Sequence, residues 1–154
     1  MQENSYLGET GMNIVYEENT LTAKQFLMLR ESVGWNGKEF QVEESLKFSL
    51  CNVAAKNGDE VIGMGRLVGD GFMYWYVQDV IVNPQYQGMG IGNEIMKNLM
   101  QYIENNSLPD TTVTIGLMAA KGKEGFYEKL GYFARPTETY GSGMMKFLEI
   151  STSG

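Results

Sequence analysis

The chain of 154 residues contains no histidine and only one cysteine, Cys51. Without histidine, Ser-His-Asp and Cys-His catalysis are excluded, and the commonest metal ligand is missing. A single cysteine forms neither an internal disulfide nor a thiolate cage for zinc. The sequence therefore predicts no metal centre and no disulfide framework.

Positive charge and long apolar runs are scarce as well. The chain has 12 Lys and Arg residues against 19 Asp and Glu residues, a formal net charge of -7. Nucleic acids and anionic membrane surfaces require a basic face, so the composition argues against both as partners. No window of about 18 apolar residues and no signal peptide is visible. We therefore expect a cytoplasmic protein that binds neither nucleic acid nor a membrane.

The chain does contain enough apolar material for one α/β domain over residues 1–154, since 43% of its residues are hydrophobic. Alternation of apolar and polar residues predicts a strand over Gly11 to Glu18. Thr22 and Gln25 form a capping box for a helix that stops at Gly34. The further expected elements are a helix over 42–50, hairpin strands over 53–56 and 61–68 joined at Asn57-Gly58, a strand over 72–82 that completes an antiparallel meander, a helix over 91–103, a strand over 111–117, a helix over 123–130 and two strands within 132–150.

A glycine-rich loop connects the strand that ends at Val82 with the long helix after it. Gly88, Gly90 and Gly92 have no side chains, so backbone N–H groups can converge on one point. The first turn of the helix adds free N–H groups and the positive end of its dipole. The pattern therefore predicts an anion site suited to a pyrophosphate. The alternative is a glycine turn needed only for close packing, and the spacing fits neither a P-loop nor a dinucleotide fingerprint.

Gln87, Gly90 and Gly92 match the signature Gln/Arg-x-x-Gly-x-Gly/Ala. At this point the chain resembles the GNAT superfamily of acyl-CoA-dependent N-acyltransferases. The Asn-Pro that ends the preceding strand and the block Gly-Phe-Tyr-Glu-Lys-Leu-Gly-Tyr at 125–132 are also similar to that family, and the resemblance is clear from about Val61 to Tyr132. It implies a single-domain α/β (α+β) fold with a mixed, mostly antiparallel sheet of about six to seven strands and about four flanking helices.

The resemblance also implies roles for individual residues. The backbone of Ile81 and Val82, with Val80 before them, would pair with the pantetheine arm of acetyl-CoA. Tyr127 would protonate the departing thiolate, and Ala120 stands where many members have an asparagine that contacts the pantetheine. The residues expected to wrap the pyrophosphate are Gln87, Gly88, Met89, Gly90, Ile91 and Gly92, and those on the helix beside the cosubstrate are Phe126 and Lys129.

Acyl transfer from a thioester to an amine needs no metal and no enzyme nucleophile. A tyrosine with a pKa of about 10 can donate its proton to a thiolate with a pKa of about 8.5, while the acceptor amine must lose a proton. Asp79 is the favoured candidate for that base, although a strand aspartate is more often a satisfied hydrogen-bonding group. Three weaker candidates for the base are Glu17, Glu18 and Glu44. Two lysines, Lys121 and Lys123, either meet a phosphate of coenzyme A or are solvated surface groups.

We therefore expect an N-acetyltransferase that moves an acetyl group from acetyl-CoA to a primary amine of a small molecule by direct attack in a ternary complex. The alternatives are a protein or peptide acceptor and a non-catalytic acyl-CoA sensor. Family members are often dimers, which leaves room for a homodimer. Surplus acid and the aromatic residues Trp35, Tyr74, Trp75, Tyr76 and Tyr140 favour a cationic acceptor. We hypothesise that residues Trp35 to Phe40 act as a lid, with Tyr140 and the turn over 141–145 helping to close the site.

Overall fold

The computed structural model describes residues 4–7 and 12–152. The chain divides into two compact units, Met1–Leu117 and Met118–Gly154, and the single domain over residues 1–154 stays a prediction. The first unit holds β1 (Asn4–Leu7), β2 (Asn13–Glu18), α1 (Ala23–Ser32), α2 (Glu39–Lys47), β3 (Cys51–Asn57), β4 (Glu60–Gly69), β5 (Tyr74–Val82), the short 3-10 helix η1 (Pro84–Tyr86), α3 (Ile91–Asn106) and β6 (Thr114–Leu117), and the second holds α4 (Glu124–Glu128).

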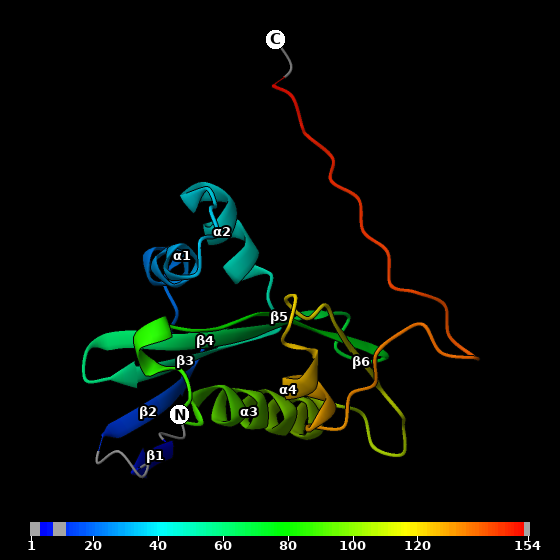
Figure 1. Ribbon diagram of the computed structural model, residues 1–154, viewed down its shortest axis with the longest axis horizontal. Coiled ribbons are helices and arrows are strands. Elements are labelled where there is room, and N and C mark those ends of the chain that lie inside the picture. Colours follow the sequence, from blue (N-terminus) through cyan, green and yellow to red (C-terminus); the bar gives the residue numbers. More distant parts are fainter. Residues whose placement is uncertain (1–3, 8–11, 153–154) are drawn as a thin grey trace. The chain divides into compact units, whose positions relative to one another are not determined.

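The strands described in the first unit form one six-stranded sheet in the order β1-β2-β3-β4-β5-β6. Every neighbouring pair is antiparallel except β5 and β6, which run parallel. α1 and α2 cover one face of this sheet, and α3 covers the other (Figure 1). The predicted α/β class with a mixed, mostly antiparallel sheet is therefore confirmed.

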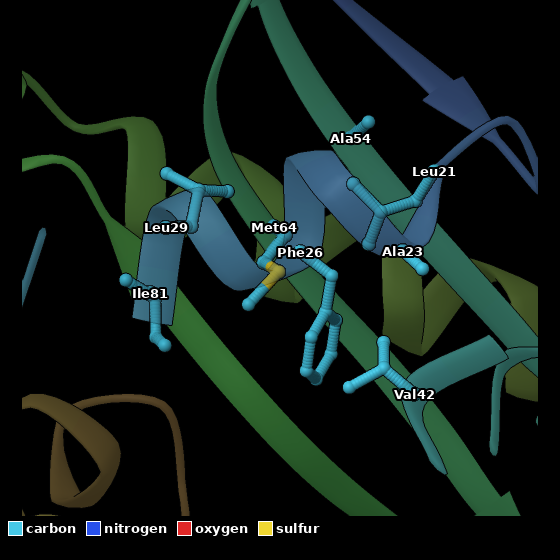
Figure 2. Packing of buried hydrophobic residues seen from close by; sticks show 8 residues of the cluster. All are labelled: Leu21, Ala23, Phe26, Leu29, Val42, Ala54, Met64 and Ile81. Atoms are coloured by element: carbon cyan, nitrogen blue, oxygen red, sulfur yellow. The ribbon is translucent and has the colours of Figure 1, made fainter. Parts of the chain in front are cut away.

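A cluster of buried apolar side chains holds α1 and α2 on their face of the sheet (Figure 2). Phe26 and Leu29 of α1 and Val42 of α2 pack against side chains from three strands. Ile81 of β5 belongs to this cluster, so α1 is held against the part of β5 that is predicted to bind the cosubstrate. The members are Leu21, Ala23, Phe26, Leu29, Val42, Ala54, Met64 and Ile81.

On the opposite face, α3 lies close to β4 because two residues of that strand are glycines. A Cβ atom at Gly65 would lie 2.8 Å from Cγ2 of Ile95 and 3.0 Å from Cδ1 of Leu99. A Cβ atom at Gly63 would lie 3.0 Å from Cδ1 of Ile95. Larger residues here would therefore push the helix away from the sheet. The close packing holds α3, and with it the glycine loop at its N-terminus, against the strands.

The start of α1 follows the prediction. Thr22 Oγ1 accepts a hydrogen bond from the N–H of Gln25, and Gln25 Oε1 accepts one from the N–H of Thr22, at 3.2 and 2.9 Å. Gly34, just past the last helical residue, has a φ of 83°. The apolar stripe predicted for α3 is also confirmed as its buried face. The buried residues of α3 are Ile91, Ile95, Met96, Leu99 and Ile103.

Two boundaries differ from the prediction. α2 begins and ends earlier than the expected 42–50, because Leu50 has already left the helix and donates its N–H to the carbonyl of Leu67 on β4 at 2.8 Å. In the β3–β4 hairpin, Asn57 pairs with Glu60, so the loop is Gly58-Asp59 rather than Asn57-Gly58. Only Gly58 of these two loop residues has a positive φ, 62°, as in a type II′ turn.

The ends of the chain show the largest differences. β1 was not expected, and Gly11 of the predicted first strand lies outside the described residues. β6 and α4 form within their predicted ranges, but the two strands expected within 132–150 are wrong, because residues 132–152 form no strand. A strand requires a neighbour for its N–H and C=O groups. The backbone hydrogen bonds of the described tail close local turns instead, such as Thr137 N–H to the carbonyl of Tyr140 at 2.8 Å.

No helix among the described residues has the length and apolarity needed to cross a membrane.

Candidate functional site

β5 is paired along only part of its edge on the β6 side. Tyr74 to Val77 pair with Thr114 to Leu117, whereas Gln78 to Val82 have no strand on that side among the described residues. An unpaired edge presents N–H and C=O groups to an added strand. The predicted pantetheine-binding residues, Val80, Ile81 and Val82, all lie on this open edge.

The open edge begins at a β-bulge in β5. Arg66 of β4 pairs with Gln78, but Met64 pairs with Ile81, so the register shifts between them. Asp79, inside this shift, has a φ of 53°, which is uncommon for a residue with a side chain. A bulge bends the strand that contains it. Here it coincides with the end of the pairing between β5 and β6.

The loop after β5 is anchored to the ends of two strands. The N–H of Asn83 donates to the carbonyl of Ile62 on β4 at 2.8 Å, and Asn83 Oδ1 accepts the N–H of Gln85 at 3.0 Å. Gln87 Nε2 donates to the carbonyl of Val82 at 3.0 Å. The Gln87 side chain therefore ties the loop to β5, a role that the signature alone did not reveal.

The glycines of this loop are needed for conformation. Gly88 and Gly90 have φ values of 80° and 81°, a region that side chains disfavour. A Cβ atom at either position would meet nothing within 4 Å. The alternative of a turn required for close packing is therefore not supported at these two residues. Residues 87–90 are exposed, so the loop is accessible to a ligand.

The N-terminus of α3 leaves several backbone donors free. Gly90 is the N-cap and provides no side-chain cap. Within the part of the chain that the structure describes, no N–H from Gly88 to Asn93 donates a hydrogen bond. These donors and the positive end of the helix dipole are what the predicted anion site requires, and the site itself stays a prediction. No Lys or Arg lies between Asn83 and Asn93. The carboxylate of Glu94, in the first turn of α3, forms an ion pair with Lys97, whose Nζ lies 4.0 Å from Glu94 Oε1. Binding of an anion by this loop would therefore rely on the main chain.

Asp79, the favoured base, is engaged by two arginines. Arg30 Nη1 donates to Asp79 Oδ1 at 2.8 Å, and Arg66 Nε donates to Asp79 Oδ2 at 2.9 Å. The Asp79 side chain is 7% exposed. Both carboxylate oxygens thus hold the bulge to α1 and to β4, which is the structural alternative stated for this residue. Its role as the base stays a prediction.

Asp79→Asn separates these two roles. Asparagine keeps the shape and tolerates a positive φ, but it leaves two partly buried guanidinium groups without their counter-charge. We expect the free energy of unfolding to fall by about 2–3 kcal/mol, below the range for fully buried pairs because both arginines reach solvent. Urea unfolding measures this. Glu44→Gln is the matched control, because it removes the exposed pair with Lys47 Nζ, 2.8 Å away, and such solvated pairs contribute little to stability. Equal stability of the two variants, with activity lost only in Asp79→Asn, would instead identify a base.

The three weaker candidates for the base either form ion pairs with lysines or are exposed. Glu17 Oε2 is 3.0 Å from Lys56 Nζ, and hydrogen bonds from Lys56 and Thr20 lower the pKa of Glu17. Glu18 is exposed at the end of β2, and Glu44 is paired with Lys47 on α2. Nothing in these contacts favours one of them as the base.

The second unit contains Tyr127, on the short helix α4. Its ring contacts those of Phe126 and Tyr132 edge to face, with centroids 4.9 and 6.1 Å apart. Burial raises the pKa of Tyr127 above its usual value, so the hydroxyl keeps its proton at neutral pH. Lys129 caps the end of α4, and Gly131 follows with a φ of 96°. The catalytic role of Tyr127 and the cosubstrate contacts of Phe126 and Lys129 stay predictions, as do the roles of the exposed lysines Lys121 and Lys123.

Two of the aromatic residues expected around the acceptor, Trp75 and Trp35, differ in their exposure to solvent. Trp75 is 3% exposed and its ring contacts Tyr102 of α3, so it belongs to the core on the α3 face. Trp35 is 39% exposed and follows α1, while Phe40 lies in the first turn of α2 rather than in the proposed lid loop. The lid itself stays a hypothesis.

Sequence reasoning did not find Arg30 and Arg66 as residues of this site. Arg66 lies inside β4 next to fully buried Leu67, and a charged residue in such a strand requires a partner. That signal was available. The partner was not identifiable, because Arg66 and Asp79 are 13 residues apart and Arg30 and Asp79 are 49 apart.

Comparison with known proteins gives consistent results. Residues 17–132 match the model of the Acetyltransferase (GNAT) family. The chain is 29% identical to an uncharacterized N-acetyltransferase ycf52-like protein of Prochlorococcus marinus, over 76% of this chain and 66% of that protein. It is 30% identical to serotonin N-acetyltransferase 2, chloroplastic, of Oryza sativa, over 62% of this chain and 46% of that protein. A crystal structure of a probable acetyltransferase from meticillin-resistant Staphylococcus aureus is similar, with 30% identity and a TM-score of 0.77 over 88% of this chain and 99% of that one. The chain thus spans about two thirds of the first relative and less than half of the second.

Proposed function

Because the chain belongs to the GNAT acetyltransferase family, we propose that it transfers the acetyl group of acetyl-CoA to the primary amine of a small molecule. One observation carries this proposal. A short loop joins the open edge of β5 to the free N–H groups at the start of α3. A diphosphate with a peptide-like arm fits such an arrangement, because the first binds at the helix N-terminus and the second pairs with the strand edge.

The reaction proceeds by direct attack in a ternary complex. The neutral amine forms a bond to the acetyl carbon, and the carbon–sulfur bond of the thioester breaks. The amine loses one proton to a base or to water, and the thiolate takes one from Tyr127. The products are the acetamide and coenzyme A, so no metal and no covalent enzyme intermediate is required.

A small acceptor is the version that we propose, and the plant relative named for serotonin, a small amine, supports it. A protein or peptide amine is the second candidate, since a soybean relative is named histone acetyltransferase TAP1. A sensor that binds acyl-CoA without turnover has less support, because it does not need the tyrosine at position 127. The cytoplasmic location and the homodimer stay predictions.

The proposal is tested by following thiol release from acetyl-CoA with a panel of small primary amines and, in parallel, with lysine-containing peptides. We expect amine-dependent release above the background hydrolysis for at least one small amine, and the matching acetamide by mass spectrometry. Release with peptides alone would replace the proposed acceptor class. Tight binding of acetyl-CoA without any release would establish the sensor.

A further inference from the structure

Arg30, Arg66 and Asp79 form what we call the arginine cluster, on the face of the sheet that α1 covers. Two guanidinium groups share one carboxylate, and no other carboxylate pairs with them among the described residues. The cluster therefore has one positive charge in excess, in a chain whose formal net charge is -7. A partly buried excess charge is costly unless an anion compensates it.

The cluster also has hydrogen-bond donors to spare. Arg30 donates to Asp79 and to the carbonyl of Asn36, and Arg66 donates to Asp79 and to Ser49 Oγ. Each guanidinium has more N–H donors than these bonds use. The two arginine side chains are 25% and 16% exposed, so an anion from solvent can reach them.

Aromatic rings lie close to both guanidinium groups. The Phe26 ring centroid lies 5.8 Å from Cζ of Arg30 and 5.8 Å from Cζ of Arg66, and the Trp35 ring lies 5.3 Å from Cζ of Arg30. Such cation–π contacts stabilise the guanidinium groups where they lie, and the planar N–H fork of a guanidinium matches the two oxygens of a carboxylate. Trp35 is 39% exposed, so part of this surface is open to a ligand.

The position of the cluster relates it to the acceptor. A pantetheine arm that starts at the loop and follows the open edge of β5 backwards ends at the bulge, where Asp79 lies. On the basis of the proposed function, we propose that the acceptor is an amine that also carries a carboxylate, bound by Arg30 and Arg66. This replaces the cationic acceptor expected from the overall composition, because the charge beside the bulge is positive.

The inference is tested with matched acceptors in the thiol-release assay. 4-Aminobutanoate is compared with propylamine, and tyrosine with tyramine, so that each pair differs by one carboxylate. We expect kcat/KM at least about tenfold higher for the acid in one pair or both, and a preference that shrinks as salt screens the arginines. Equal rates, or faster turnover of the amines without a carboxylate, would overturn the inference and leave the proposed function intact. Absence of release with every amine would instead contradict the proposed function.

Variants of the two arginines test whether they cause the preference for the acid. Arg30→Gln and Arg66→Gln are each expected to raise KM for the acid and to bring the ratio of the pair toward one. Lys24→Gln is the control, because it removes an exposed positive charge from the same helix and should leave the ratio unchanged. An increase of KM for acetyl-CoA rather than for the acid would overturn the assignment. If either arginine variant fails to fold, the ratio measured with the wild type still decides, since an equal or lower kcat/KM for the acid contradicts recognition by arginine.

Discussion

Gly90→Asp is expected to weaken acetyl-CoA binding by at least about a hundredfold, which is about 2.7 kcal/mol. The new carboxylate would stand at the N-cap of α3, beside the free N–H groups that we assign to the diphosphate. Near a protein surface, like charges about 4 Å apart repel by about 4 kcal/mol before salt screening. The same carboxylate can also accept the free N–H groups of the first turn and so compete with the phosphate. Calorimetric titration with coenzyme A measures the loss.

Two controls separate charge from conformation in this experiment. Gly90→Asn has the same shape and the same strain without the charge, so its affinity should lie between those of the wild type and Gly90→Asp. Gly58→Asp places the same residue at another positive φ, 62°, with nothing within 4 Å of the added Cβ. It should bind coenzyme A normally. A folded Gly90→Asp protein with wild-type affinity would show that the diphosphate binds elsewhere.

The features of the fold and of the site that the sequence predicted correctly are those that depend on residues close together in the chain. The capping box of α1, the apolar stripe of α3 and the glycine bend before it are short patterns whose physical causes lie within one turn of the chain. The positive φ values at Gly88 and Gly90 follow from the same local chemistry. For this reason the conformation of the glycine loop was predictable down to individual residues, while its role in binding an anion stays a prediction.

The bulge and its ion pairs were not predictable in this way. Asp79 was recognised as a charged residue on the strand that enters the loop, but its conformation depends on how β4 and β5 come into register. Its partners are brought to it by the docking of α1 onto the sheet. The same limit explains the tail, where the apolar pattern of 144–150 has the composition of a strand. Composition alone does not supply the neighbour that a strand must pair with.

Tyr127→Phe is expected to lower kcat by at least about a hundredfold, the usual contribution of a positioned general acid, with little change in the affinity for coenzyme A. The ring contacts with Phe126 and Tyr132 do not need the hydroxyl, so the fold should be retained. Tyr132→Phe is the matched control, since it removes a hydroxyl from the neighbouring ring. A large loss in Tyr132→Phe with none in Tyr127→Phe would move the acid to the other tyrosine.

The pH dependence of kcat gives an independent test of the same assignment. Burial raises the pKa of Tyr127 above its usual 10.0, so the proton that the thiolate needs is present at neutral pH and is lost only as the pH rises through that raised value. The alkaline decline of kcat should therefore lie above pH 10 in the wild type. It should disappear in Tyr127→Phe, whose residual rate no longer depends on that proton. A decline well below the usual pKa of tyrosine would assign the proton to a stronger acid and contradict the role of Tyr127.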